Sequence, residues 1–206
     1  MPTLRSLQVR RIGLFGGSFD PPHNAHVALA RVALDHLKLD ELRWVLTGRA
    51  YQKVRQISDA EDRKAMVALA IADEPRFKLE TCELDRTGAS YSIDTVRELD
   101  AVEHAEWFLI IGQDQYANLH TWRDWPELLQ RVTIAVASRS GQWPQASAEV
   151  TATPHRVISL PLPRIDISAT AIRQNANEGR DYTDMVPALV ASYIDSHHLY
   201  RGIPRN

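Results

Sequence analysis

The sequence has very little cysteine and little net charge. Cys82 is the only cysteine in 206 residues, which excludes an internal disulfide framework and argues against a zinc site built on thiolates. We expect this thiol to lie unreactive in or beside a strand. The formal net charge is -2, so no global positive field points to nucleic acid. A local basic pocket for a polyphosphate is still compatible with that balance.

Long apolar runs and the common phosphate loops are also absent. No uninterrupted apolar run approaches about 18 residues, and the opening MPTLRSLQVRR lacks the apolar core of a signal peptide. We therefore expect a cytoplasmic protein that binds neither membrane nor nucleic acid. Neither a G-x-G-x-x-G fingerprint nor a G-x-x-x-x-G-K-[ST] loop occurs, so the sequence predicts neither of these nucleotide sites.

Segments of strand and helix character alternate along the chain. Strands are predicted at 10–15, 41–47, 76–80, 82–84, 106–112, 131–138 and 155–160. Helices are predicted at 24–37, 59–72, 92–99, near 115, and at 125–129, 167–179 and 185–200, with 139–154 as a loop. This alternation predicts an α/β fold with a doubly wound, mostly parallel sheet. We expect a single domain over 1–206, with a core at about 10–165 and a small helical part at about 166–206.

Polar segments follow three of the predicted strands, after IGLF, FLII and VISL. Ligands of open parallel sheets bind beyond the carboxyl ends of the strands. We therefore expect these three segments to converge in space.

The first of them, GGSFDPPHNAH, places two histidines at the start of a helix. Because Pro21 and Pro22 cannot lie inside a helix, His23 falls at the helix mouth and His26 in its first turn. Both imidazoles then join the positive helix end as donors that can be charged or neutral near pH 7. We favour a phosphate site. The simpler alternative is a helix cap with a packed histidine, and a zinc pair lacks a suitably spaced third ligand.

The segment RIDISATAIR ends the last strand and opens another helix. Ser168 and Thr170 supply hydroxyl and N–H groups at this helix mouth, and Arg173 follows one turn later. Ordinary serine capping with a surface arginine is the alternative. Two such helix mouths in one chain favour phosphate binding at both.

These segments resemble a known family. GGSFDPPHNAH resembles the G-G-x-F-D-P-x-H-x-G-H signature of the HxGH nucleotidyltransferases, and ISATAIR is similar to their I-S-S-T-x-I-R element. ELDRTGASYSIDTVREL, FLIIGQDQYANLHTWRDWPELL and RSG resemble stretches of the bacterial nicotinate-nucleotide adenylyltransferases. The similarity runs from about Ile12 to Tyr200. Ala25 replaces a family glycine, and TGRAYQKVRQ replaces a Pro-Pro-His-Lys segment, with Arg49, Lys53 and Arg55 as candidate substitutes.

The resemblance implies a Rossmann-like enzyme of NAD biosynthesis. Such an enzyme transfers AMP from ATP to nicotinate mononucleotide, giving nicotinate adenine dinucleotide and pyrophosphate. It implies Mg²⁺ carried by the ATP phosphates, with no metal ligand from the protein. It assigns catalysis to His23, His26 and Arg173, ATP binding to Gly16, Gly17, Ser18, Phe19, Gly112, Asp114, Ser168, Thr170 and Arg173, and nicotinate-nucleotide binding to Tyr91, Ser92, Trp122 and Lys53.

Within this assignment, Asp114 holds the ATP ribose, and Trp122 faces the pyridine ring, unless Trp122 is simply a core tryptophan. The polar segment from Gly48 to Ser58 is expected to close over the substrates as a lid. Two alternatives stay open. One is the same fold acting on nicotinamide mononucleotide or phosphopantetheine, and the other is a non-catalytic nucleotide-binding regulator. A homo-oligomer is compatible with the sequence.

Overall fold

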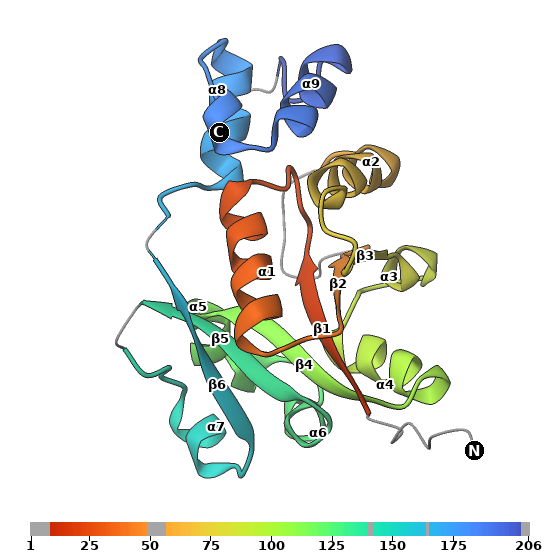
Figure 1. Cartoon of the computed structure of the whole chain (residues 1–206), viewed down its shortest axis with the longest axis vertical. Helices are drawn as coiled ribbons and strands as arrows, with labels where there is room; N and C mark the ends of the chain where they lie inside the picture. The colour runs from red at the N-terminus through yellow and green to blue at the C-terminus, as the bar shows by residue number, and fades with distance from the viewer. Residues whose placement is uncertain (1–8, 49–56, 140–141, 164, 203–206) are drawn as a thin grey trace, which may run out of the picture.

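The protein folds around one parallel sheet. The computed structural model describes residues 9–48, 57–139, 142–163 and 165–202. Within these ranges, six parallel strands pair in the order β3-β2-β1-β4-β5-β6 (Figure 1). They are β1 (Arg10–Gly17), β2 (Glu41–Leu46), β3 (Phe77–Glu80), β4 (Ala105–Gly112), β5 (Thr133–Arg139) and β6 (Arg156–Leu162). The predicted doubly wound sheet is confirmed, and its strand order reverses between β1 and β4, where such sheets bind ligands.

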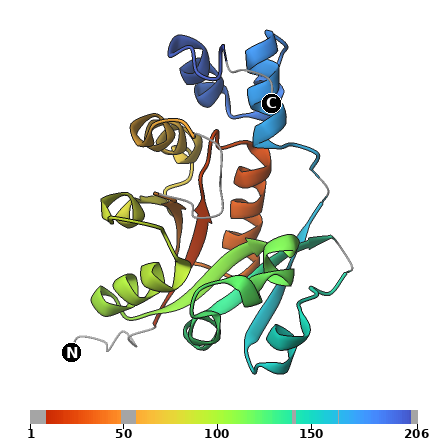
Figure 2. The same ribbon diagram turned by 180° about the vertical axis from the view of Figure 1, so that it is seen from behind.

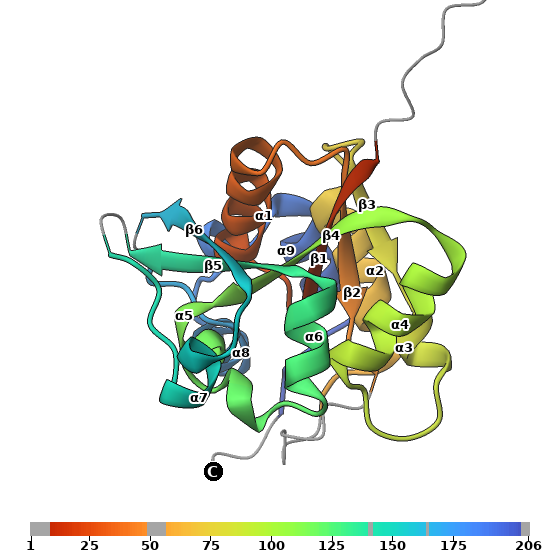
Figure 3. The same cartoon turned by 90° about the horizontal axis from the view of Figure 1, so that it is seen from below.

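Helices cover both faces of the sheet. The helices α1 (Asn24–His36) and α2 (Ala60–Ile71) pack on one face. The other face carries α4 (Ser92–Val102), α5 (Gln113–Ala117) and α6 (Trp125–Arg131). Figure 3 shows α1 and α6 on opposite sides of the sheet, and Figure 2 shows the face that α4 and α6 cover.

The central strand β4 contains an unbroken apolar run at 107–111. Phe108 and Ile110 point into the cluster beneath α1, whereas Leu109 and Ile111 point into the cluster beneath α4 and α6. Because both faces of this run are buried, its positions are all apolar instead of alternating with polar ones.

The C-terminal helices form a smaller layer with its own apolar cluster. They are α8 (Ala169–Glu178), the 3-10 turn η2 (Thr183–Met185) and α9 (Ala188–Ser196). Ile172, Val190 and Ile194 are buried there together with Met66 of α2. Figure 1 shows α8 beginning beside the start of α1, beyond the carboxyl ends of the strands. The predicted division of the chain near residue 165 stays a prediction.

Four local predictions differ from the structure, besides the helix predicted at 185–200, which is the 3-10 turn η2 followed by the shorter helix α9. Gly16 and Gly17 extend β1 by two residues beyond its predicted end at Phe15. Residues 82–84 belong to a short helix, α3 (Cys82–Asp85), because the N–H of Leu84 turns back to donate to the carbonyl of Thr81 at 2.8 Å. The sequence allows Ser92 to cap the helix predicted at 92–99, but in the structure Tyr91 is the N-cap of α4 and Ser92 is its first residue.

The fourth difference is α7 (Ala148–Ala152), which lies inside the predicted loop. Ser147 starts it by accepting a hydrogen bond from the N–H of Val150 at 3.4 Å, and Val150 is fully buried. In the described part of the chain, no helix is both long and apolar enough to cross a membrane.

Candidate functional site

The turn after β1 is built on a buried aromatic residue. Phe19 adopts a left-handed backbone conformation, with φ 44°, and is 2% exposed. Its ring packs against Trp44 and meets the imidazole of His26 edge-on, with centroids 5.2 Å apart. The side chain of Phe19 therefore lies in the core beneath His26, and it lines neither of the cavities described below.

The two histidines stand where the sequence predicts them. His23 is the N-cap of α1, and His26 lies in its first turn. The N–H of His23 donates to Nδ1 of His26 at 3.2 Å, so in the neutral ring the proton of His26 sits on Nε2. Burial lowers the pKa of His23 to about 4, which makes this imidazole neutral at pH 7. Its Nδ1 is buried and has no hydrogen-bond partner among the described residues.

The start of α8 meets the start of α1. The Ser168 hydroxyl caps α8 by accepting a hydrogen bond from the N–H of Ala171 at 3.2 Å. Arg173 donates to the hydroxyl oxygen of Thr170 at 3.1 Å and to the carbonyl oxygen of Asp20 at 2.7 Å. The second of these bonds joins residues 153 positions apart and brings the two predicted helix mouths together. Two helix N-termini and a guanidinium then share one edge of the sheet, which suits a polyanion.

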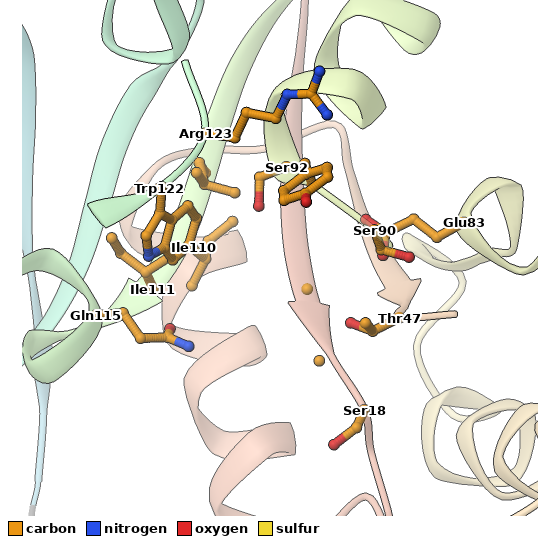
Figure 4. A pocket seen from close by; sticks show the side chains of 14 residues that line it. Ser18, Thr47, Glu83, Ser90, Ser92, Ile110, Ile111, Gln115, Trp122 and Arg123 are labelled. Carbon is orange, nitrogen blue, oxygen red and sulfur yellow. The ribbon is translucent and has the colours of Figure 1, made fainter. Parts of the chain in front are cut away.

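A cavity of about 200 Å³ lies between the carboxyl ends of β1 and β4 (Figure 4). The predicted residues Gly16, Gly17, Ser18, Tyr91, Ser92 and Trp122 all line it. Figure 4 shows Trp122 and Thr47 on opposite sides of the space, with Ser92 between them and Ser18 at one end. Trp122 also packs against the core below α6, so the cavity and the core share this side chain.

A buried carboxylate closes the far side of this cavity. Glu83 of α3 is 7% exposed, and it accepts a hydrogen bond from the hydroxyl of Thr95 at 2.7 Å. Burial raises the pKa of Glu83 despite that bond. Gly48 packs so closely here that a Cβ atom on it would lie 2.2 Å from the carbonyl oxygen of Glu83. The wall of the cavity therefore depends on a glycine after β2.

Two arginines at the site are absent from the sequence prediction. Arg123 lines the cavity with its guanidinium over the ring of Tyr91, 4.8 Å from the ring centroid. Because Arg123 directly follows Trp122 in the sequence, its place beside a predicted site residue marks it as a candidate. Arg63 is 2% exposed and donates to the carbonyl oxygens of Thr47 at 2.8 Å and Ser18 at 3.1 Å. It looks like an ordinary surface residue of a helix in the sequence, because only the tertiary structure reveals its burial.

Gly112 and Asp114 line a second, wider cavity of about 850 Å³ at the ends of β4 and β5. Its other walls include Ser138 and Trp143, and the latter side chain is 68% exposed. Gln115 borders both cavities, so they adjoin across the start of α5. The segment predicted as a lid falls mostly outside the described residues, and so do Lys53, Arg49 and Arg55.

No group of three or more His, Cys, Asp or Glu side chains in the described ranges is arranged to hold a metal ion. Cys82 is half-buried at the start of α3, and burial together with the charge of Glu80 raises its pKa to about 12. The thiol is therefore protonated and unreactive at pH 7.

Known proteins are similar to this chain in sequence and in fold. The model of the cytidylyltransferase-like family matches residues 14–175. A protein of Methylibium petroleiphilum is 52% identical over 95% of this chain and 96% of its own. One of Albidiferax ferrireducens is 45% identical over 94% of this chain and 99% of its own. Both carry the name "Probable nicotinate-nucleotide adenylyltransferase".

Among solved structures, the nicotinic acid mononucleotide adenylyltransferase of Plasmodium falciparum complexed with NaAD has the same fold. It matches with a TM-score of 0.75 over 93% of this chain and 97% of its own, at 17% sequence identity. The sheet order and the paired helix mouths define a nucleotidyltransferase with a Rossmann-like fold. Taken with the sequence matches, the chain belongs to the cytidylyltransferase-like family and, within it, to the nicotinate-nucleotide adenylyltransferases.

Proposed function

We propose that this enzyme joins nicotinate mononucleotide to the AMP portion of ATP. A phosphate oxygen of the mononucleotide attacks the α-phosphorus of ATP. The bond from that phosphorus to the bridging oxygen breaks, and its electron pair leaves with pyrophosphate. The observation that carries this proposal is the 2.7 Å hydrogen bond from Arg173 to Asp20, because it joins two anion-binding helix ends at the switch point of the sheet.

The reaction needs alignment more than proton transfer. A phosphate monoester has its second pKa near about 6, so the nucleophile is already ionised at pH 7. This agrees with the junction of α1 and α8, where histidines and an arginine gather and the carboxylate of Asp20 is held by Tyr200. The work left to the protein is to bring two polyanions together and to stabilise the charge of an in-line transition state.

We place the ATP phosphates between the starts of α1 and α8. Nδ1 of His26 accepts a hydrogen bond from the N–H of His23, so its Nε2–H is free to donate a hydrogen bond to a phosphate oxygen. His23 caps the same helix start, and its neutral imidazole lies beside His26, where it can donate a hydrogen bond to the phosphates. Arg173, Ser168 and Thr170 face the same ligand from α8.

The two cavities suit the two nucleoside ends. Asp114 in the wider cavity offers a carboxylate to the ATP ribose hydroxyls. The smaller cavity has one flat aromatic wall, Trp122, for a pyridine ring. Near that wall, the helix α4 begins at Ser92, and the first N–H groups of a helix have no acceptor within it. They suit the carboxylate of the nicotinate ring.

The residues present fit Mg²⁺ that arrives with ATP. The acidic residue of the histidine loop, Asp20, is 1% exposed, and its carboxylate accepts a hydrogen bond from Tyr200, so it is poorly placed to bind a metal directly. When bound to the phosphates, Mg²⁺ would neutralise part of their charge and stabilise the leaving pyrophosphate.

The proposal is tested by pyrophosphate release from ATP and Mg²⁺ with three acceptors offered separately. They are nicotinate mononucleotide, nicotinamide mononucleotide and phosphopantetheine. We expect fast release with the first and a product that contains both nucleosides. Faster release with another acceptor would assign the chain a different substrate. ATP binding without release with any of the three would indicate a regulator.

A further inference from the structure

Asp20 is a buried carboxylate that the proposed reaction leaves without a role. It lies in the turn between β1 and α1, three residues before His23, and it is 1% exposed. A buried charge is stable only where donors surround it. One of its donors is the hydroxyl of Tyr200, at 2.8 Å from Oδ1, and another is the N–H of Ser58, at 3.4 Å from Oδ2.

Tyr200 comes from the other end of the chain, 180 residues away. It follows α9, is 6% exposed and has φ 66°. A bulky residue adopts this left-handed conformation only where its surroundings hold it there. Burial and the negative charge of Asp20 raise the pKa of Tyr200, so its hydroxyl stays protonated and donates.

Asp20 accepts hydrogen bonds from two C-terminal segments at once. Its carboxylate accepts a hydrogen bond from the hydroxyl of Tyr200, and its carbonyl oxygen accepts one from the guanidinium of Arg173 at 2.7 Å. Figure 1 shows α8 and α9 as a layer set apart from the sheet, with α8 rising beside the start of α1. This one residue therefore ties the C-terminal layer to the histidine loop.

We propose that Tyr200 is a positioning residue for the triphosphate site. By holding the Asp20 side chain, it fixes the carbonyl oxygen that orients Arg173, and it fixes the turn that leads to His23. The inference rests on the proposed function for the identity of the ligand. The effect falls mainly on ATP, because Asp20, Arg173 and Tyr200 are not among the residues that line the mononucleotide cavity. A displacement of about 1 Å at such a site can lower the rate up to about 10²-fold.

The test compares Tyr200→Phe with Tyr182→Phe. Tyr182 is a matched control, since it is 7% exposed in the same apolar cluster and its hydroxyl donates to Asp195 at 2.9 Å, away from the histidine loop. We expect Tyr200→Phe to raise the KM for ATP about tenfold or more, with the KM for the mononucleotide unchanged. Tyr182→Phe should change neither. Equal ATP KM values in the two variants, at comparable thermal stability, would overturn the inference.

A double variant tests the path of the effect. If Tyr200 acts through Arg173, then Tyr200→Phe adds nothing to the rise in ATP KM that Arg173→Ala already causes. If the two substitutions instead raise the ATP KM independently, so that their fold-changes multiply in the double variant, this path is contradicted. Should Tyr200→Phe fail to fold, Asp20→Ala serves instead, because it removes the carboxylate that accepts the Tyr200 hydroxyl. We expect the same rise of about tenfold or more in the ATP KM, and an unchanged ATP KM in the folded variant would contradict the proposal.

Binding of ATP alone separates this inference from the proposed function. Calorimetry with ATP and Mg²⁺ gives a Kd that needs no acceptor and no turnover. If the wild type releases no pyrophosphate, yet Tyr200→Phe alone weakens ATP binding, the proposed function fails and the positioning role stands. If turnover is normal and the wild type, Tyr200→Phe and Tyr182→Phe all have the same Kd for ATP, the positioning role fails and the proposed function stands.

Discussion

The imidazole rings of His23 and His26 stack at the start of α1, with centroids 3.6 Å apart and planes 20° apart. Two protonated rings at this distance would repel each other, and burial already lowers the pKa of His23 to about 4. The sequence allows His23 to be charged or neutral near pH 7, and in the folded protein it is neutral. Phosphate charge is then balanced mainly by Arg173 and the helix ends, while His23 contributes a directed hydrogen bond.

We expect His23→Ala to fold and to turn over slowly. Loss of one pre-organised donor to a reacting phosphate lowers the rate by about 10²–10³-fold. Pyrophosphate release at saturating substrates measures the effect on kcat, and circular dichroism establishes folding. Wild-type turnover by a folded His23→Ala protein would remove His23 from the reaction.

His23 also makes stability depend on pH. Its pKa is lower in the folded protein, about 4, than in the unfolded chain, where it is near 6.5. The unfolded chain therefore binds more protons between these values, and stability is lost as the pH falls from 6.5 to 4. The loss is on the order of 3 kcal/mol for the complete window.

Urea unfolding at pH 7 and pH 4.5 measures this loss. The difference between the two free energies should be smaller in His23→Asn than in the wild type, because an amide does not titrate. The carboxylates titrate in both proteins, so the comparison isolates the imidazole. Equal losses in the two proteins would mean that His23 is not desolvated in the folded state.

Sequence patterns predict the features that follow from local chemistry. The two prolines and the apolar periodicity place the start of α1 correctly, with His23 as its N-cap. The unbroken run FLII marks β4 as buried on both faces. The secondary structure of short segments is harder to predict. Residues 82–84 form a helix because the chain turns at Thr81, although their sequence favours a strand.

The remaining features depend on contacts between distant parts of the chain. Arg63 lies in a sequence typical of an exposed helix, and only the approach of β1 and β2 buries it against the carbonyl oxygens of Ser18 and Thr47. Likewise, nothing near Asp20 in the sequence announces Tyr200, because their contact spans 180 residues. Periodicity and spacing carry no information about such pairs.

Arg173→Ala should weaken ATP binding more than it weakens the fold. Its guanidinium is held by the Asp20 carbonyl and the Thr170 hydroxyl, which aim it at the junction of α1 and α8. We expect the KM for ATP to rise by about 10-fold or more, as for the loss of a charge-assisted hydrogen bond. Steady-state kinetics with varied ATP measure this. An unchanged KM for ATP would show that the segment ISATAIR is an ordinary capped helix whose arginine does not bind the ligand.

Gly48→Ala should distort the mononucleotide cavity. The added Cβ would lie 2.2 Å from the carbonyl oxygen of Glu83, so β2 and α3 must move apart. Such overpacking costs about 1–3 kcal/mol in the free energy of unfolding. Gly16→Ala is the stability control, because a Cβ atom added at Gly16 would meet no atom within 4 Å. Equal unfolding free energies for the two variants would contradict the close packing at Gly48.

The substrate preference follows from the groups at the start of α4. Nicotinate mononucleotide carries a carboxylate on its ring where nicotinamide mononucleotide carries a carboxamide. At this substituent the pocket offers hydrogen-bond donors, namely the helix N–H groups at Ser92, and the guanidinium of Arg123 lies nearby over Tyr91. The helix end favours the carboxylate by roughly 0.3–1 kcal/mol. An amide turns its own N–H groups toward donors and leaves polar groups unpaired, at about 1–3 kcal/mol each.

Together these terms predict a preference for nicotinate mononucleotide of about 10- to 10³-fold in kcat/KM. The measurement is kcat/KM for each mononucleotide at fixed ATP and Mg²⁺. Arg123→Gln should reduce the preference by up to about fivefold, since the lost charge is exposed to solvent. Arg131→Gln is the control, because Arg131 pairs with Asp100 at 3.0 Å and lies off the cavity lining. Equal use of the two mononucleotides by the wild type, or a preference for the amide, would show that donors at Ser92 do not select the substrate.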